Sequence, residues 1–269
     1  MRRSPAIALA LVAALTGCGG SHHEQVNPER MLDQAAAHPI SSADAEIDAR
    51  LRVLGVERLS QPIRVRLEGP YVSGGPDRIP SFDWRLSASA LGFPVSGRVI
   101  STGDNAYLTV YGSQYEVGHG AVADANERLA AAGGLRLDLR SWLGPARVTG
   151  QGSAGGEDCE RIAAPLRRQA TTDGLAPLAG ALGLPEPLAA SGRATACIGF
   201  DDHTLHELEL RVALGVPEAD RARLYGATGV LLDADIVLSD VGDQQQIEVP
   251  SGSPRPIRDL FLTLSDLAG

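Results

Sequence analysis

Acidic and imidazole side chains gather most densely in one short stretch, at Asp201-Asp202-His203 and His206-Glu207. Carboxylate and imidazole groups so close together could hold a divalent cation, and a bound metal could support hydrolysis. The same stretch separates two alternating segments, which is typical of a hairpin turn whose polar side chains face water. We favour the turn and keep a metal-dependent hydrolase resting on His203 and His206 as a competing interpretation.

Other signatures of catalysis are weak. Gly150 to Gly155 match the spacing G-x-G-x-x-G, but a dinucleotide-binding loop needs a strand before it and a helix after it. Here a strand-like segment follows, so a flexible turn fits better. No G-x-S-x-G serine motif occurs, and all 24 basic residues are arginine, which excludes a lysine nucleophile or Schiff base. The sequence therefore predicts no enzyme, no metal and no cofactor.

The N-terminal residues carry a different kind of chemistry. Arg2 and Arg3 precede an apolar run from Ala6 to Ala14, and Leu15-Thr16-Gly17-Cys18 follows. This arrangement resembles the lipobox of bacterial lipoproteins, in which the cysteine is acylated and the residues before it are removed. An ordinary secretory signal with an incidental cysteine is the alternative. The resemblance implies a lipoprotein signal peptide over residues 1–17, a flexible tether over 18–26 and anchoring by acyl chains to the outer face of the bacterial cell membrane.

Two further cysteines then remain, Cys159 and Cys197. In an oxidising compartment they are expected to form a disulfide. Two free buried thiols remain the alternative, and a metal site is less favoured because neither cysteine has C-x-x-C spacing or a nearby histidine.

Charge and composition limit the partners. The formal net charge is −9, and removal of residues 1–17 takes away Arg2 and Arg3 and makes it −11. An acidic chain is repelled by the phosphates of nucleic acids and by anionic headgroups, so we expect no nucleic-acid partner and no electrostatic attraction of the whole domain to the bilayer. Aromatic residues make up 4% of the chain, which is sparse for a base- or sugar-stacking surface.

Hydrophobic periodicity predicts a mainly antiparallel protein. Asn27-Pro28-Glu29 indicates a helix start, with the helix ending near Ala37. Alternation of apolar and polar residues predicts strands from residue 45 onward. A Gly112-Ser113 turn would pair Val110 with Tyr115 and place Leu108 on the same face. The remaining expected elements are helices at 121–132, 172–182 and 256–261, and strands at 157–167, 192–200, 205–214 and 229–238.

The order of these elements, behind a lipobox, resembles the LppX/LprG family of lipoproteins, whose fold is akin to the lipoprotein carrier LolA. The phrases that carry the resemblance are Phe82-Asp83-Trp84-Arg85-Leu86, residues 97–108, Tyr115-Glu116-Val117, Trp142-Leu143-Gly144-Pro145 and Ile247-Glu248-Val249-Pro250. The resemblance implies an α+β fold: a strongly curved, largely antiparallel sheet, or half-barrel, with helices across its concave face and an apolar cavity for acyl chains between them. Candidate lining residues are Trp84, Leu86, Leu108, Val110, Tyr115, Leu208, Leu210 and Val212, for each of which plain core packing is the alternative.

These observations predict a single lipid-binding-like domain over residues 27–269. Its expected function is to bind, and to transfer, a lipid or lipoglycan without catalysis. A transporter partner in the membrane would stay unidentified. The alternative is a non-catalytic envelope adaptor or sensor whose core is filled.

Overall fold

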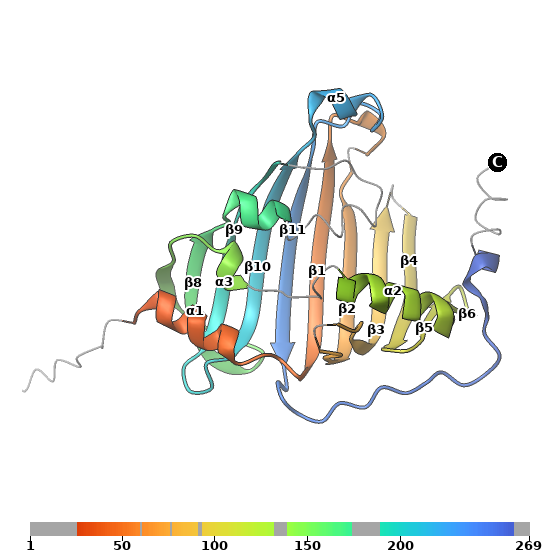
Figure 1. Ribbon diagram of the computed structural model, residues 1–269, viewed down its shortest axis with the longest axis horizontal. Coiled ribbons are helices and arrows are strands. Elements are labelled where there is room, and N and C mark those ends of the chain that lie inside the picture. Colours follow the sequence, from red (N-terminus) through yellow and green to blue (C-terminus); the bar gives the residue numbers. More distant parts are fainter. Residues whose placement is uncertain are drawn as a thin grey trace, which may run out of the picture.

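One large sheet organises the molecule (Figure 1). The computed structural model describes residues 26–59, 61–75, 77–90, 93–131, 139–173 and 189–260. Within them the strands are β1 (Ser42–Leu54), β2 (Ile63–Val72), β3 (Ser81–Ala90), β4 (Phe93–Thr102), β5 (Ala106–Val110), β6 (Ser113–Glu116), β7 (Arg147–Ala154), β8 (Glu157–Pro165), β9 (Ala189–Gly199), β10 (Leu205–Gly215), β11 (Gly229–Ser239) and β12 (Arg255–Pro256). The helices are α1 (Pro28–Ala37), η1 (Glu57–Leu59), α2 (His119–Ala131), α3 (Leu139–Trp142) and α5 (Glu218–Arg221). Residues 168–173 are also helical.

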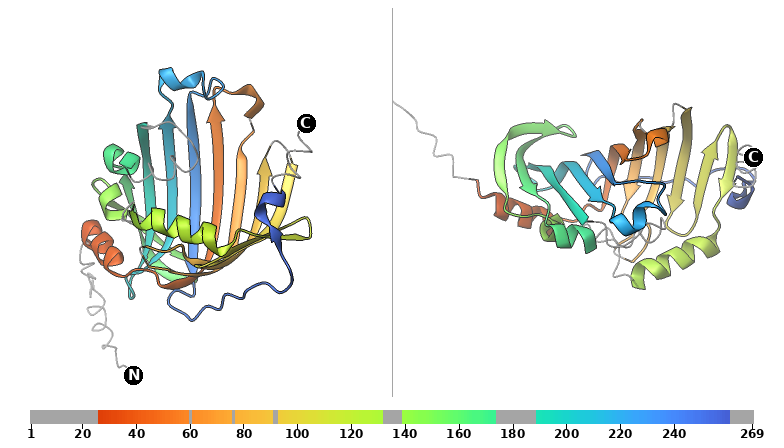
Figure 2. Two further views of the ribbon diagram at one scale, coloured as in Figure 1. Left: turned by 45° about the vertical axis from the view of Figure 1, so that its right-hand side comes forward. Right: turned by 90° about the horizontal axis from the view of Figure 1, so that it is seen from above.

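The strands follow the order β12-β6-β5-β4-β3-β2-β1-β11-β10-β9-β8-β7 in a 12-stranded sheet. Two antiparallel meanders, β1 to β6 and β7 to β11, are joined by the pairing of β1 with β11, and only β12 runs parallel to its neighbour. The sheet is curved and unclosed, and α1, α2 and α3 lie on one side of it (Figure 2). The predicted α+β half-barrel with helices across its concave face is thereby confirmed.

Alternation gives this sheet one apolar face and one mainly polar face. Ala45, Ile47 and Ala49 of β1 lie opposite Leu238, Ile236 and Ala234 of β11. The residues between them on β1 are charged, and they point to the other face because successive side chains of a strand alternate. The same phase continues through β2 and β10, where Leu67 faces Ile47 and Leu208 faces Ile236. The predicted strand from residue 45 therefore exists, and it begins earlier, at Ser42.

Helix α1 forms where its sequence signals predict. The Asn27 side chain accepts hydrogen bonds from the backbone N–H groups of Glu29 and Arg30 at 3.1 and 3.2 Å. Pro28 occupies the first turn, where no N–H is needed. The helix buries Met31 and Leu32, which belong to the largest apolar cluster among the described residues. This helix therefore closes one end of the apolar face.

Helix α2 is held mainly by polar contacts. Val122 is its buried residue. The Asn126 side chain accepts from the Ile79 N–H at 2.8 Å and donates to the Gly103 carbonyl at 3.0 Å. The His119 ring donates from Nδ1 to the Asp104 carbonyl at 2.9 Å. The helix is thus fastened at the edge of the sheet and contributes little to a packed core.

The β5–β6 hairpin differs from its predicted register. Tyr111 and Gly112 form the turn, with φ values of 49° and 74°, and Leu108 pairs with Tyr115 while Val110 pairs with Ser113. Two successive positive φ angles are typical of a type I′ turn, whose twist matches the flanking strands. The predicted Gly112-Ser113 turn was one residue too late. The predicted face is kept, because a two-residue shift in pairing leaves the side-chain alternation unchanged.

The C-terminal segment also differs from prediction. Arg255–Pro256 forms the short strand β12 beside β6, so the expected helix over 256–261 begins only at residue 257. The expected helix over 172–182 and the end of that over 121–132 extend beyond the described residues. In the described part of the chain, no helix is long and apolar enough to cross a membrane.

Candidate ligand-binding face

The eight residues predicted to line a cavity lie on one face of the sheet. Trp84 pairs with Val99, Val99 with Leu108, and Leu108 with Tyr115 along a row that crosses β3 to β6. Leu86 and Val110 both lie opposite Gly97 in the next row. On the other side of the molecule, Leu208, Leu210 and Val212 lie opposite Ile236, Ala234 and Leu232. This is the face that α1 packs against.

At the α1 end this face is filled by protein. Leu208 and Val212 are 3% and 7% exposed and belong to the same cluster as Met31 and Leu32 of α1. Leu143, which follows α3 and is 2% exposed, completes the cover. For Leu208 and Val212 the structure therefore shows core packing, which was the alternative for each candidate.

The centre of the same face is less well covered. Apolar side chains of β1, β2, β3, β10 and β11 are only half-buried there: Leu51, Val65, Leu67, Leu86, Leu210 and Leu232. Figure 1 shows α1 and α3 toward one side of the sheet and α2 toward the other, with the middle strands between them. Apolar surface left between partly packed elements is the usual lining of a ligand site.

Trp84 is the distinctive side chain of this face. Its ring stacks on Phe82 with centroids 4.1 Å apart and an interplanar angle of 15°. Gly69 lies opposite Trp84 on β2, and a Cβ there would come within 2.3 Å of the Asp83 carbonyl oxygen. The indole Nε1 of Trp84 is buried without a hydrogen-bond partner among the described residues. An unpaired buried donor costs about 1–3 kcal/mol, so this N–H would gain from an acceptor that reached it when the covering side chains move.

A buried polar network positions the N-terminal end of α2. Asn105 is 1% exposed and donates from Nδ2 to the Tyr107 hydroxyl at 3.0 Å and to Glu116 Oε1 at 2.6 Å. Its Oδ1 accepts from the N–H groups of Ala106 and Gly118 at 2.9 and 3.0 Å. The amide therefore ties the β4–β5 turn to the connection that leads into α2. Sequence reasoning identified only a turn at Asn105, because its partners lie up to 13 residues away.

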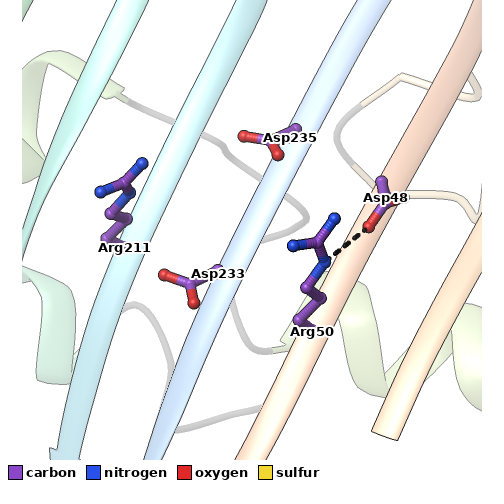
Figure 3. Close-up of a pocket in the computed structure, with 5 residues that line it drawn as sticks. All are labelled: Asp48, Arg50, Arg211, Asp233 and Asp235. Atoms are coloured by element: carbon purple, nitrogen blue, oxygen red, sulfur yellow. Dashed lines mark ion pairs between the residues drawn. The ribbon is translucent and has the colours of Figure 1, made fainter. Parts of the chain in front are cut away.

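The opposite face of the sheet is charged. Asp48, Arg50, Arg211, Asp233 and Asp235 line a shallow pocket on β1, β10 and β11 (Figure 3). Arg50 and Asp48 form its one drawn ion pair, at 3.6 Å. Alternation places these residues away from the predicted lining, and sequence reasoning did not select them.

Ion pairs continue along this charged face. Arg85 donates from Nε to Glu68 at 2.7 Å, and Arg66 contacts Glu46 at 2.9 Å. The hydrogen bond and the positive charge of Arg85 lower the pKa of Glu68. These exposed pairs stabilise the fold only weakly, because water and salt screen them.

The Asp/His cluster forms a turn. His206 is 3% exposed, and its Nε2 lies 2.8 Å from Asp202 Oδ2. The Thr204 N–H donates to Asp202 Oδ1 at 3.0 Å. Burial acts to raise the pKa of Asp202, but the hydrogen bonds from Thr204 and His206 outweigh it and lower that pKa. Among the described residues no group of three acidic, histidine or cysteine side chains is arranged to hold a metal.

Gly199 explains how this turn closes. A Cβ at Gly199 would lie 2.0 Å from Asp202 Oδ1 and 3.0 Å from His206 Nε2. Only glycine therefore allows the carboxylate and the imidazole to meet against the strand.

The remaining sequence candidates are placed as follows. Cys159 and Cys197 form a disulfide with Cα atoms 5.4 Å apart, in a small buried cluster with Ala154. The glycine-rich stretch 150–155 lies mostly in β7 and ends in the β7–β8 turn, with a strand rather than a helix after it. Cys18 and the tether up to residue 25 lie outside the described residues.

Comparisons with known proteins found similarity of structure and none of sequence family. No protein-family model and no curated protein matches it. In structure it is similar to the lipoprotein LppX of Mycobacterium tuberculosis, with a TM-score of 0.47 and 12% identity over 82% of this chain and 98% of that chain. It is also similar to LprF of Mycobacterium bovis, with a TM-score of 0.47 and 12% identity over 84% of this chain and 97% of that chain.

A LolA superfamily protein of Nitrosomonas europaea is a further structural match, with a TM-score of 0.26 and 9% identity over 81% of this chain and 96% of that chain. At this level of similarity the comparisons concern the fold alone.

Proposed function

We propose that this protein binds the acyl chains of a lipid or lipoglycan against the apolar face of its sheet and performs no covalent chemistry. The observation that carries the proposal is the half-buried centre of that face, where Leu67, Leu86 and Leu210 are incompletely covered. Trp84, on β3 of the same face, adds an indole N–H without a partner among the described residues. Acyl chains would cover the leucines, and an ester or headgroup oxygen would accept from Trp84. Burial of apolar area supplies the free energy, at about 25 cal/mol per Å².

Helix α2 is the element we propose to move when ligand passes. It buries Val122. Among the described residues, hydrogen bonds of Asn126 and His119 provide its other attachment to the end of the sheet. Polar contacts of this kind can be exchanged for contacts with water, so opening costs less than separating a packed apolar interface. By contrast, α1 is fixed by the main cluster and would stay in place.

The resemblance at the N-terminus supports a location for this activity. We propose that Cys18 is acylated and that the domain works on the outer face of the bacterial cell membrane, tethered by residues 18–26. Transfer of ligand to or from that membrane is part of the same proposal.

A filled-core adaptor or sensor is the second candidate. The observation that favours it is the α1 end of the apolar face, where Leu208 and Val212 already pack against protein. This alternative predicts that the centre of the face closes on itself without a ligand.

Native mass spectrometry separates the two candidates. The four apolar clusters of the described fold lie within residues 26–260, so the chain from residue 19 onward contains its own core. It would be produced in a bacterial periplasm and sprayed from a volatile buffer. Extra mass that is lost on denaturation and identified as phospholipid or glycolipid supports lipid binding. If the mass is that of the protein alone, and stays so after incubation with lipid vesicles, the result would contradict lipid binding and support the filled-core adaptor.

A further inference from the structure

The two ends of the sheet carry opposite charge. The loop end is defined as the end where β1, β8 and β10 finish and where β2, β9 and β11 begin. Over residues 50–57, 63–64, 167–173, 189–193 and 211–233 it holds nine arginines and five carboxylates. Over residues 44–48, 66–85, 98–104, 157–161, 201–209 and 235–243 the opposite end holds five arginines and seventeen carboxylates. The formal charge of −9 is therefore distributed unevenly along the strands, with an excess of arginine at the loop end and an excess of carboxylate at the opposite end.

An arginine row runs across the polar face near the loop end. In register across five neighbouring strands lie Arg193, Arg211, Asp233, Arg50 and Arg64. Arg193 directly faces Arg211, and Arg50 directly faces Arg64, although like charges opposite one another destabilise a sheet. Figure 3 shows the middle of this row, with Asp233 between Arg211 and Arg50.

Most of these arginines are available to an outside partner. Arg64, Arg193 and Arg211 are exposed, and no ion pair or side-chain hydrogen bond holds them within the described structure. At the opposite end, by contrast, Arg66 and Arg85 are engaged by Glu46 and Glu68. A surplus of unpaired arginines is the surface that binds phosphate oxygens, because guanidinium presents a fork of donors.

Exposed apolar and aromatic side chains project from the same end. Tyr225, in the connection after α5, is 91% exposed, Phe93 at the start of β4 is 73% exposed, and Leu54 at the end of β1 is 36% exposed. Tyr225 adopts a φ of 54°, which is uncommon for a bulky residue. Amphipathic tyrosine rings favour the boundary between water and hydrocarbon.

This end is a firm structure. The Thr228 N–H donates to the Leu54 carbonyl at 2.8 Å, and the Gly226 N–H donates to the Arg221 carbonyl at 2.7 Å. Val216 and Ala227 are buried beneath the connection at 5% and 6% exposure. In Figure 1, α5 and the β1–β2 connection stand together at the top of the sheet, away from the chain that leaves β11 below.

We propose that the loop end is a docking surface for an anionic membrane. Arginines of the row contact lipid phosphates, Tyr225 and Leu54 enter the interface, and repulsion of the acidic opposite end sets the orientation. The net charge predicted repulsion from such a surface, whereas its distribution produces attraction at one end. Docking in this way goes beyond lipid binding and beyond the acyl anchor, because it requires neither of them.

Vesicle flotation tests this proposal with the chain from residue 19 onward carrying no acyl group. The probes are vesicles of phosphatidylcholine alone and of phosphatidylcholine with 30% phosphatidylglycerol. We expect binding to the anionic vesicles only, weakening as salt rises because exposed charges are screened. The triple variant R64Q/R193Q/R211Q should bind the anionic vesicles about 100-fold more weakly, since each arginine near such a surface contributes about a fivefold factor.

A matched control removes the same charge elsewhere. R30Q/R128Q/R255Q changes three exposed arginines of α1, α2 and β12, and it should retain the wild-type affinity. Equal loss in both triple variants would show attraction by charge alone and overturn a docking surface. Equal binding to both kinds of vesicle, or to neither, would overturn it as well. Because flotation measures attachment and not ligand uptake, its result is independent of the mass-spectrometric test of lipid binding.

Discussion

Trp84 shows how much a single atom can add to an otherwise apolar surface. A phenylalanine at its position would preserve an aromatic ring for stacking on Phe82. It would remove the unpaired N–H, which costs folding free energy and is useful only if something accepts from it.

The W84F variant should therefore separate binding from stability. We expect two- to tenfold weaker binding of a fluorescent acyl ester, which corresponds to the loss of one hydrogen bond of about 0.5–1.5 kcal/mol. The midpoint temperature of thermal unfolding should be unchanged or slightly higher, because a buried unpaired donor is removed. W142F in α3 is the control, and it should leave binding unchanged. Unaltered binding in W84F would remove Trp84 from the proposed site.

Asp202 provides a second prediction at this scale. Although burial opposes it, the hydrogen bonds from Thr204 and His206 hold the pKa of Asp202 below its ordinary value of 3.8. The folded protein then binds fewer protons than the unfolded chain in acid. The stabilising contribution is complete above about pH 5 and is lost as the pH falls through the lowered pKa.

Urea unfolding between pH 3 and pH 7 checks this sign. The D202N variant should be less stable than wild type at pH 7, and the difference should shrink toward pH 3. D201N, which changes the exposed neighbouring carboxylate, is the control and should follow the wild-type curve. A D202N difference that is constant over this range would contradict the proposed role of the ionised carboxylate.

At the scale of elements, the two covering helices are attached by different physics. Helix α1 buries Met31 and Leu32 in the main cluster, whereas α2 depends on Val122 and on hydrogen bonds from Asn126. Apolar burial resists opening over a wide range of conditions, and a few hydrogen bonds resist it much less. The part of a fold that opens most readily is its least stable cooperative unit, and of these two helices that unit is α2.

The N126A variant should loosen α2 selectively. Two part-buried hydrogen bonds disappear, so we expect a loss of about 1–3 kcal/mol in the local stability of residues 119–131. Hydrogen exchange by mass spectrometry would show this as faster exchange in α2, with α1 unchanged. E127A, an exposed change on the same helix, should exchange like wild type. If α1 and α2 accelerate together in N126A, then the helices do not open separately.

The disulfide acts on the β8–β9 pair. It joins residues separated by 38 positions, and in the chain-entropy model a loop of this size contributes about 3–4 kcal/mol. The C159A/C197A variant should lose about that much free energy of unfolding in urea. Its sheet should persist, because β8 and β9 are also paired from Glu160 to Pro165. Reductant should shift the wild-type curve toward that of the variant and leave the variant unchanged.

For the whole molecule, the decisive property is that one sheet separates two surfaces. The apolar face is proposed for acyl chains, and the polar face carries the arginine row. A change on one face of a strand should therefore affect a different activity from the same change on the other face.

Strand β10 offers a matched pair of substitutions. L210R introduces a charge on the half-buried centre of the apolar face, and A213R introduces the same charge on the polar face. Native mass spectrometry should show lipid lost from L210R and retained by A213R, since a desolvated guanidinium cannot lie against acyl chains. Retention of lipid by a folded L210R protein would show that β10 does not line the site.

Local patterns in the sequence determined much of this protein. The Asn27-Pro28 signal located α1, alternation identified the strands, and the same alternation placed all eight lining candidates on one face. These predictions succeed because a helix cap and a period of two depend only on residues a few positions apart. The predicted turn differed by one residue from the observed turn at Tyr111-Gly112, because several small or polar residues there could form neighbouring turns.

Only the tertiary structure decided which distant segments meet. It paired β1 with β11, and so aligned Arg50 with Asp233 and Arg211 from strands far apart in the chain. It also buried Leu208 and Val212 under α1 while leaving Leu210 half-covered, a difference that no spacing within β10 could reveal. The physical reason is that strand register and helix docking are set by the packing of the whole sheet, whereas the sequence pattern specifies only which side of each strand is apolar.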